Sequence, residues 1–461
     1  MDLKEDLKAL ISELNHIHSS DFDWKKYSGF PSFVTAANGA QRHFTTAAKN
    51  SLHRVVEHLH SNRPSNNVRV EIGNYEKIVQ QVIADCHAEG EFDAFYETGE
   101  KSIIEKIRQL AEERLPSKGY EYTHYFSAWT VGVEKKTPFK LGPVTFWNRL
   151  AWVDSVDFPP NAKETYLENK EANHQWRDLL KNALQHRNKE VELDGLAAPI
   201  YDAIYNCPAL LGVTISGYEK DLSRKLAKLV CRTALDSISL ALGGAEYFHQ
   251  QTLYEERLPP VGSASLLESN SYLWLPGLTL GKRIPHLSGD RVEEALRDMA
   301  PFLPAFASIL NGLVDPENHT HPKLANRWAT ALDWYGEGNR ESSDSIALAK
   351  LGTCLDVLAC GGKNAGIADM VINITGTDGD TEVVKGDKPL TLRALVREIY
   401  ETGRSRILHG TYSDRLQPFE RERNRAAQLA RHVLMESAMR LLQYSGDDGD
   451  TSFRSMPPVT R

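Results

Sequence analysis

The chain of 461 residues has few cysteines, no long apolar run and no excess of positive charge. Its five cysteines are odd in number, scattered and never in a C-x-x-C pair, which argues against a disulfide framework and indicates small apolar side chains in a reducing cytoplasm. No run of 18 apolar residues occurs and the first ten residues are charged, so we expect a cytoplasmic protein without a membrane span or signal peptide. The net charge of -8 argues against general coating of nucleic acid.

Signatures of nucleotide-driven and metal-dependent chemistry are missing as well. The chain has no P-loop and no Rossmann glycine fingerprint. His58 and His60 lie close together but not as H-E-x-x-H, so a solvated amphipathic helix explains them better than a metal site. Asp378, Asp380 and Glu382 lack the spacing of a calcium loop and indicate an acidic flexible loop. We therefore expect no metal and no cofactor.

Average hydrophobic (41%) and charged (25%) contents indicate a globular protein, and the length suggests two or three domains. We predict a mainly α fold with a small β portion (α+β). Apolar residues at helical spacing, such as Val55, Val56 and Leu59, predict a helical N-terminal region over 1–116. A mixed α+β middle region over 117–320, a sensor or scaffold, should contain strands at 120–134, 141–148 and 210–218, helices at 164–187 and 221–242, and surface loops at 251–290.

The region 321–445 predicts an antiparallel bundle of four amphipathic helices. Gly336 and Gly338 should end the first helix. Ser342 or Ser343 should cap the second helix, and Gly361 and the glycine after it should end that helix. The third should run from 391 to the glycine at 403 and the fourth over 419–444. The polar stretch 363–389 indicates a mobile insert, and 446–461 a disordered tail.

A basic segment lies inside this bundle. From 391 to 431 there are nine arginines, no lysine and five acidic residues, an excess of four positive charges on an acidic chain. Arginine side chains match the geometry of phosphate oxygens. The simpler interpretation is a solvated face with internal Arg–Glu pairs, as in RERNR at 421–425.

The same segment contains EIYETGRSRILHGTYSDR at 398–415, in which four residues separate Arg404 from His409. This arrangement resembles the HEPN superfamily, and more narrowly the ApeA-like group of prokaryotic defence proteins. The resemblance covers about 125 residues. It rests on Tyr400, on the Arg-Ser dipeptide Arg404-Ser405 and on the His-Gly dipeptide His409-Gly410. An acidic residue in the preceding helix, Asp356, is a looser match.

The resemblance implies a HEPN endoribonuclease with Arg404 and His409 as catalytic residues; the site-supporting residues would be Tyr400, Ser405, Arg406, Gly410 and Asp356. It also implies a homodimer with a composite active site. The expected RNA substrate is tRNA or mRNA, and the expected role is a toxin of anti-phage defence (abortive infection) that responds to a phage-derived or protein trigger.

The residue types suit this chemistry. Histidine, with an unperturbed pKa of about 6.5, moves protons to and from the 2'-hydroxyl and the leaving 5'-oxygen, while arginine neutralises charge on the phosphorane. On a regular helix, however, a separation of five residues leaves two side chains about 140° apart. Either the helix is distorted near the glycines at 403 and 410, or the Arg404 side chain curls towards His409, or a second chain completes the site.

Three alternatives compete with this hypothesis. Arg404 would be a surface cation that pairs with Glu401 or Asp414, and His409 a half-buried residue. Ser405 and His409, four residues apart, would share a helix face, but no G-x-S-x-G elbow surrounds the serine. A non-catalytic HEPN-like module would serve only for dimerisation or RNA binding.

Overall fold

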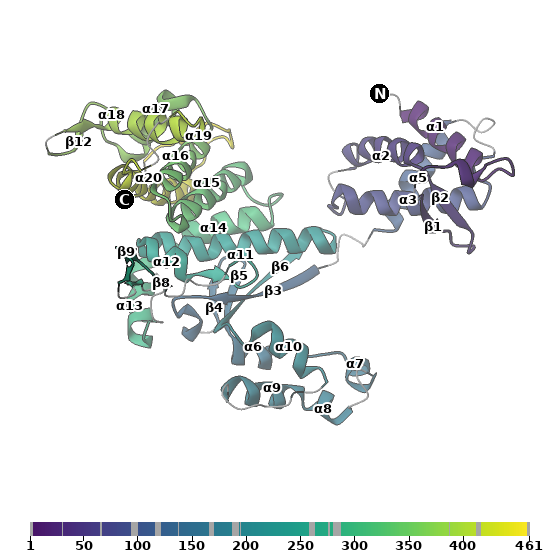
Figure 1. The fold of residues 1–461 in the computed structure, drawn as a ribbon, viewed down its shortest axis with the longest axis horizontal. Coiled ribbons are helices and arrows are strands. Elements are labelled where there is room, and N and C mark those ends of the chain that lie inside the picture. The colour runs from purple at the N-terminus through teal and green to yellow at the C-terminus, as the bar shows by residue number, and fades with distance from the viewer. Residues whose placement is uncertain are drawn as a thin grey trace. The chain divides into compact units, whose positions relative to one another are not determined.

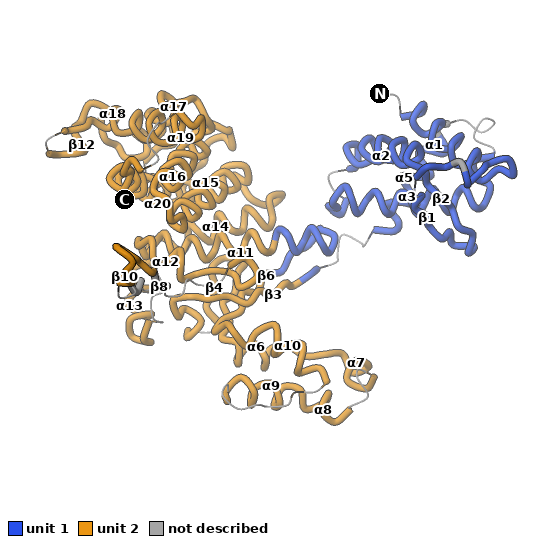
Figure 2. The backbone as a smooth tube through the Cα atoms, viewed as in Figure 1, with its two compact units in different colours: residues 1–122, 214–226 blue, residues 123–213, 227–461 orange. Residues whose placement is uncertain are grey.

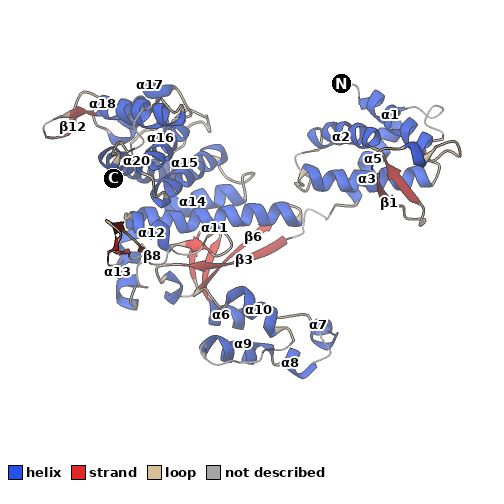
Figure 3. Cartoon of the chain, viewed as in Figure 1, coloured by secondary structure: helices blue, strands red, loops and turns tan. Residues whose placement is uncertain are grey.

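The computed structural model describes residues 3–458 except 30, 65–66, 94–99, 116–120, 137, 166–169, 187–192, 194, 258–262, 275–276, 280–286, 387 and 412–415. With 61% helix and 11% strand, it confirms the predicted mainly α fold with a small β portion (Figures 1 and 3). The chain forms two compact units, 1–122 with 214–226 and 123–213 with 227–461 (Figure 2). The boundary predicted near 117 lies close to the end of the first segment, whereas position 320 falls inside unit 2.

Unit 1 is a helical layer with one hairpin. Its core contains Leu10, Val56 and Val79, one residue from each of the three longest helices. The strands have only four residues and little β-branched content, and the sequence did not predict them. The elements are α1 (Leu3–Ile17), η1 (Trp24–Lys26), β1 (Ser32–Thr35), β2 (Gln41–Phe44), α2 (Thr46–Ser61), α3 (Ile72–Ala88) and α5 (Glu100–Glu113).

A five-stranded sheet organises the first part of unit 2, in the order β4-β5-β6-β3-β7. The pairs β4–β5, β5–β6 and β3–β7 are antiparallel, and the predicted strands all belong to this sheet. Helix α11 (Lys220–Leu242) lies along one face. The other face carries α6 (Arg149–Ser155), α9 (Trp176–Gln185) and α10 (Ala197–Ile204) (Figure 1). The strands are β3 (Glu121–Trp129), β4 (Phe139–Leu141), β5 (Val144–Asn148), β6 (Ala209–Ser216) and β7 (Thr252–Leu253).

The helix predicted over 164–187 is wrong. Its described residues form parts of three short helices, α7 (Pro160–Thr165), α8 (Lys170–His174) and α9 (Trp176–Gln185). Asn173 of α8 is fully buried and uses its side chain to accept the Leu196 N–H at 3.1 Å and to donate to the Lys163 carbonyl at 3.3 Å. A buried asparagine that bonds to backbone competes with a continuous helix.

Short elements complete the middle of unit 2. The stretch 251–290, predicted as surface loops, contains small hairpins and the start of a helix, although Leu266 and Tyr272 are exposed as expected. The elements are η2 (Val133–Lys136), α6 (Arg149–Ser155), α10 (Ala197–Ile204), α12 (Ala245–Gln250), β8 (Ser263–Ser265), β9 (Glu268–Ser269), β10 (Tyr272–Leu273), β11 (Gly277–Thr279) and α13 (Gly289–Met299).

The C-terminal helices form one packed bundle. Helix α16 contacts α15, α20 and the π-helix η3, so the four predicted helices do pack together. Ser343 occupies the N-cap position of α16, but its side chain makes no capping hydrogen bond. Helices α14 and α17 join them, which was not predicted. The bundle consists of α14 (Leu303–Val314), α15 (Pro322–Arg340), α16 (Asp344–Leu358), α17 (Lys363–Thr375), α18 (Leu392–Arg397), η3 (Glu398–Ser405), α19 (Arg406–Leu408) and α20 (Glu420–Gln443).

Glycines that were expected to end helices lie inside them. Helix α15 runs to Arg340, so Gly336 and Gly338 are buried interior positions. A Cβ on Gly338 would lie 2.9 Å from the side chain of Leu351. These glycines therefore permit close approach of neighbouring helices and do not terminate the helix.

The insert predicted over 363–389 is also wrong in its first half. Residues 363–375 form α17, which buries Met370 and Val371. The following stretch pairs β12 (Glu382–Val384) with β13 (Leu390–Thr391). The apolar residues of α17 belong to the bundle core. The polar residues around them led to the prediction of a loop.

The tail predicted to be disordered packs on the bundle over its described residues, 446–458. Phe453, which lies in η4 (Ser452–Arg454), and Met456 are fully buried. Arg454 donates to the Ala359 carbonyl at 2.8 Å, and Asp448 accepts the Leu324 N–H at 3.0 Å. Two buried apolar side chains and these caps order the segment despite its Gly- and Asp-rich composition.

Candidate functional site

The sequence segment that carries Tyr400 and Arg404 folds as a π-helix. In η3 the Arg406 N–H bonds to the Glu401 carbonyl, five residues back, and also to the Gly403 carbonyl. Such wide turns are rare and often occur at functional sites. This distortion includes Gly403, near which one of the three explanations of the five-residue spacing placed it.

Gly403 does not end this helix but lets it approach α16. A Cβ on Gly403 would lie 2.8 Å from the Leu348 side chain. On α16, a Cβ on Gly352 would lie 3.0 Å from the Arg404 Cβ and 3.3 Å from the Ile399 carbonyl oxygen. The two glycines bring the backbones together, and Asp356, one turn beyond Gly352, then faces η3.

Arg404 is held by groups from both helices. Its Nη2 lies 3.0 Å from an Asp356 carboxylate oxygen, and its Nη1 lies 3.5 Å from the Tyr400 hydroxyl. The guanidinium carbon also stands 5.4 Å from the centre of the Tyr400 ring, a cation–π distance. Its Nε has no hydrogen-bond partner among the described residues. The structure therefore brings Asp356, Tyr400 and Arg404 together.

The acidic neighbours of Arg404 are engaged elsewhere. Glu401 accepts a hydrogen bond from Asn364 of α17 at 3.0 Å, and Glu398 pairs with Arg425 of α20 at 3.3 Å. Arg404 thus pairs with Asp356 instead of Glu401; the other predicted partner, Asp414, lies outside the described residues. Sequence reasoning missed Gly352 and Asn364, and an unexplained glycine in an apolar helix was the available signal.

The second half of the motif ends the helix. His409 is the exposed C-cap residue of α19, and Gly410 follows with a φ of 65°. The Gly410 N–H bonds to the Ile407 carbonyl at 3.1 Å and the Thr411 N–H to the Arg406 carbonyl at 2.9 Å. This is a Schellman motif, so backbone geometry alone accounts for glycine after the histidine.

The structure does not join the two proposed catalytic side chains. Among the described residues no hydrogen bond or ion pair links Arg404 to His409, because the guanidinium turns towards Asp356. Ser405 and Arg406 lie between them, half-buried and exposed respectively, and the Ser405 carbonyl accepts the His409 N–H at 3.0 Å. Ser405 and His409 show no side-chain bond that would support a nucleophilic pair in the described chain.

Several arginines of the segment 391–431 form ion pairs or hydrogen bonds with residues of other helices. Arg423 bonds to Asp344 at 2.8 Å and Arg425 to Glu398, so the internal Arg–Glu pairs expected for RERNR are not what these two residues form. Arg431 donates to the Leu240 carbonyl at 2.9 Å. Several of the nine arginines therefore hold helices together, whereas Arg397 and Arg406 are exposed.

The positions considered for metals have other uses. Among the described residues no group of three or more His, Cys, Asp or Glu side chains is arranged to hold a metal ion. His60 contacts the Val70 carbonyl at 2.9 Å, and Asp378 accepts the Asp380 N–H at 2.8 Å in a turn. Four of the five free cysteines are buried, and burial raises the pKa of the Cys86 thiol to about 12. They pack as apolar residues.

Comparisons with known proteins find no relative. No family model matches the chain, and neither a curated protein nor a solved structure matches it. In the described part of the chain no single helix is long and apolar enough to cross a membrane; only α16 and α17 taken together, bent by 73° at their junction, meet the length and composition test.

Proposed function

We propose that this protein is a metal-independent endoribonuclease of the HEPN type, with Arg404 and His409 as catalytic residues. The observation that carries the proposal is the placement of Arg404 on a π-helix, between the Asp356 carboxylate and the Tyr400 ring, with 29% of its side chain exposed. Such a guanidinium is oriented and still accessible to a phosphate oxygen.

In the proposed reaction His409 takes the proton of a 2'-hydroxyl, whose oxygen attacks the adjacent phosphorus. The bond to the 5'-oxygen breaks, a proton returns to that oxygen, and the products are a 2',3'-cyclic phosphate and a 5'-hydroxyl. Arg404 stabilises the charge on the phosphorane oxygens. His409 suits the role of a proton carrier because its imidazole is exposed at a helix end.

The proposal requires two chains. Since no hydrogen bond or ion pair joins Arg404 to His409 in the described part of one chain, we propose a homodimer in which the arginine of one chain and the histidine of the other act on one phosphate. Tyr400 and Asp356 orient Arg404; Ser405, Arg406 and Gly410 shape the helix end that presents His409. The cellular role that we propose is a cytoplasmic defence effector that cuts tRNA or mRNA after a phage-derived or protein trigger.

The direct test is cleavage of RNA by the purified full chain in excess EDTA, with DNA of the same sequence beside it. We expect RNA to be cut with 2',3'-cyclic phosphate ends, DNA to survive, and His409→Ala to lower the rate about 10²- to 10⁴-fold. The matched control is His432→Ala, which removes an exposed histidine of α20. Wild-type rates in both Arg404→Ala and His409→Ala would refute the proposal.

A mixing experiment tests the composite site. Arg404→Ala and His409→Ala chains are each expected to be inactive, but a mixture should regain about a quarter of wild-type activity, since half of random dimers are mixed and each has one intact site. No recovery in dimers shown to have exchanged subunits would contradict a site shared between chains.

One alternative has a specific observation in its favour. The Arg404–Asp356 pair and the Schellman motif at Gly410 both have structural uses without any catalysis. A non-catalytic HEPN-like module for dimerisation or RNA binding would keep these features. It predicts that expression of the wild type and of His409→Ala at matched levels has the same effect on cell growth.

A further inference from the structure

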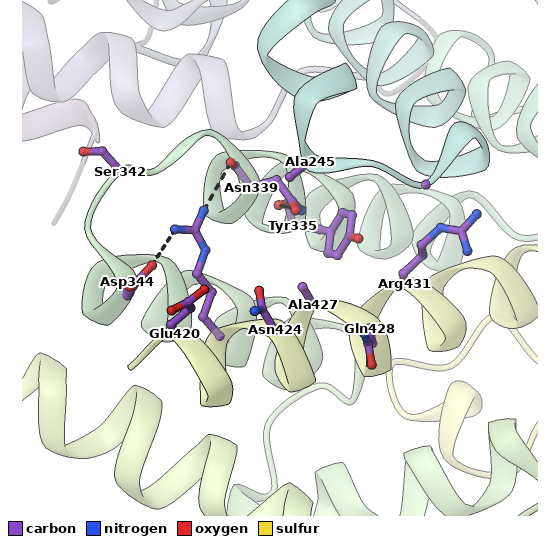
Figure 4. Close-up of a pocket in the computed structure, with 12 residues that line it drawn as sticks. Ala245, Tyr335, Asn339, Ser342, Asp344, Glu420, Asn424, Ala427, Gln428 and Arg431 are labelled. Atoms are coloured by element: carbon purple, nitrogen blue, oxygen red, sulfur yellow. Dashed lines mark hydrogen bonds and ion pairs between the residues drawn. The ribbon is translucent and has the colours of Figure 1, made fainter. Parts of the chain in front are cut away.

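A polar pocket of about 600 Å³ lies in unit 2 between α15, α20 and the turn from α11 to α12. Figure 4 shows side chains of α20 rising towards Tyr335 and Asn339 of α15. The volume lies in the range of sites for small molecules. None of the proposed catalytic residues lines this pocket, so a ligand could bind there whether or not the chain cleaves RNA.

One face of α20 forms the long wall of the pocket. Glu420, Asn424, Gln428 and Arg431 line it at intervals of three or four residues, so they share that face. From Glu420 to Arg431 the helix rises about 16 Å. An elongated molecule is therefore needed to reach both ends, and a lone phosphate or a single base would reach only one.

One end of the pocket is built for an oxyanion. Arg431 donates from Nε to the Leu240 carbonyl and from Nη2 to the Ala241 carbonyl, both at 2.9 Å, while its guanidinium packs flat on Gly243. Its Nη1 has no partner among the described residues. Tyr335 also lines the pocket, and its phenol is a hydrogen-bond donor at neutral pH; burial raises its pKa further, to about 12. A phosphate group suits these donors.

The middle and the other end offer amides and one carboxylate. The exposed Asn424 and Gln428 side chains make no hydrogen bond to a described residue, and such amides bind the edges of nucleobases in pairs of hydrogen bonds. Asp344 is neutralised by Arg423 at 2.8 Å, whereas Glu420 forms no ion pair in the described chain and accepts hydrogen bonds only. This end therefore favours a group with N–H donors.

We propose that the pocket binds a nucleoside monophosphate whose base carries an exocyclic amino group. The phosphate lies at Arg431 and Tyr335, and the base lies along Asn424 and Gln428 with its amino group towards Glu420. With Arg423 and Asp344 paired, the remaining charges are Arg431 and Glu420 at opposite ends, which complements an anionic phosphate and an amino donor. Adenine, cytosine and guanine meet this requirement, and uracil does not.

Titration calorimetry of the full chain with AMP tests the proposal. We expect AMP to bind, and the double substitution Asn424→Ala with Gln428→Ala to weaken binding at least about 10-fold. Both residues are exposed, so this variant should fold, which its thermal midpoint verifies. The matched control is Gln443→Ala, which removes an exposed amide of α20 that does not line the pocket.

Ligand variants test each end separately. UMP and inorganic phosphate should each bind at least about 10-fold more weakly than AMP, and Glu420→Gln should reduce the preference for AMP over UMP. Absence of AMP binding to the wild-type chain at millimolar concentration would overturn the proposal. Equal AMP affinities of the wild type and the folded double variant would overturn it as well.

Discussion

Two Arg–Asp ion pairs connect helices of unit 2 that are distant in sequence, and their surroundings differ. Arg340 of α15 meets Asp236 of α11 with side chains 5% and 0% exposed, and it also donates to the Phe248 carbonyl at 2.9 Å. Arg404 of η3 meets Asp356 of α16 with side chains 29% and 15% exposed, and its Nε is unpaired among the described residues.

This difference separates a pair that holds helices together from one that a ligand can reach. Burial raises the pKa of Asp236 even beside the Arg340 guanidinium, so loss of Arg340 leaves the Asp236 carboxyl buried without its ion-pair partner, whereas Arg340 also pairs with Glu337. The second pair is partly exposed to solvent, so a phosphate oxygen can reach Arg404 while Asp356 keeps the guanidinium oriented. Similar residue pairs therefore serve stability in one place and, as we propose, chemistry in the other.

The largest effect on stability is expected at the buried pair. Arg340→Ala should lower the free energy of unfolding by about 3–5 kcal/mol, because Asp236 is left buried and unpaired. Urea denaturation followed by circular dichroism measures this loss. The joint replacement Arg340→Met with Asp236→Leu should recover most of it, since no charge is then buried. A loss below about 1 kcal/mol in Arg340→Ala would remove the contrast between the pairs.

At the exposed pair, a substitution should affect RNA cleavage more than stability. Asp356→Asn should change the free energy of unfolding by less than about 1 kcal/mol but lower RNA cleavage about 10-fold, because Arg404 loses the carboxylate that orients it. Asp356→Glu should restore part of the rate. The comparison of kcat, KM and thermal midpoint across the three proteins measures this. An unfolding loss near that of Arg340→Ala would assign Asp356 a structural role.

A smaller contrast in stability is expected from the glycines beside the two pairs. A Cβ on Gly336 would lie 2.6 Å from an Asp236 oxygen, so Gly336→Ala should cost about 1–3 kcal/mol. On Gly352 it would meet the Arg404 Cβ at 3.0 Å, and the helix propensity of alanine offsets part of the clash, so we expect about 1 kcal/mol or less. Thermal unfolding compares the two variants, and a greater loss in Gly352→Ala would reverse the contrast.

Much of the fold could be predicted from local patterns. Apolar spacing located α2, α11 and the four main bundle helices, because burial of one face sets that period, and aromatic and β-branched residues located β3, β5 and β6. Predictions failed where a residue distant in sequence determines the local structure. Asn173 of the short helix α8 bonds to the distant Leu196 N–H, and Phe453 orders the tail through burial under the bundle.

The candidate site shows the same division. The sequence alone determined which residues are present between 398 and 410, their charges and the glycine that ends the helix after His409, because these are local properties of the chain. Only the tertiary structure decided that Arg404 turns to Asp356 and not to Glu401 or His409. The physical reason is that the close approach of α16 and η3, permitted at Gly352 and Gly403, places a carboxylate nearer to the guanidinium than any local partner.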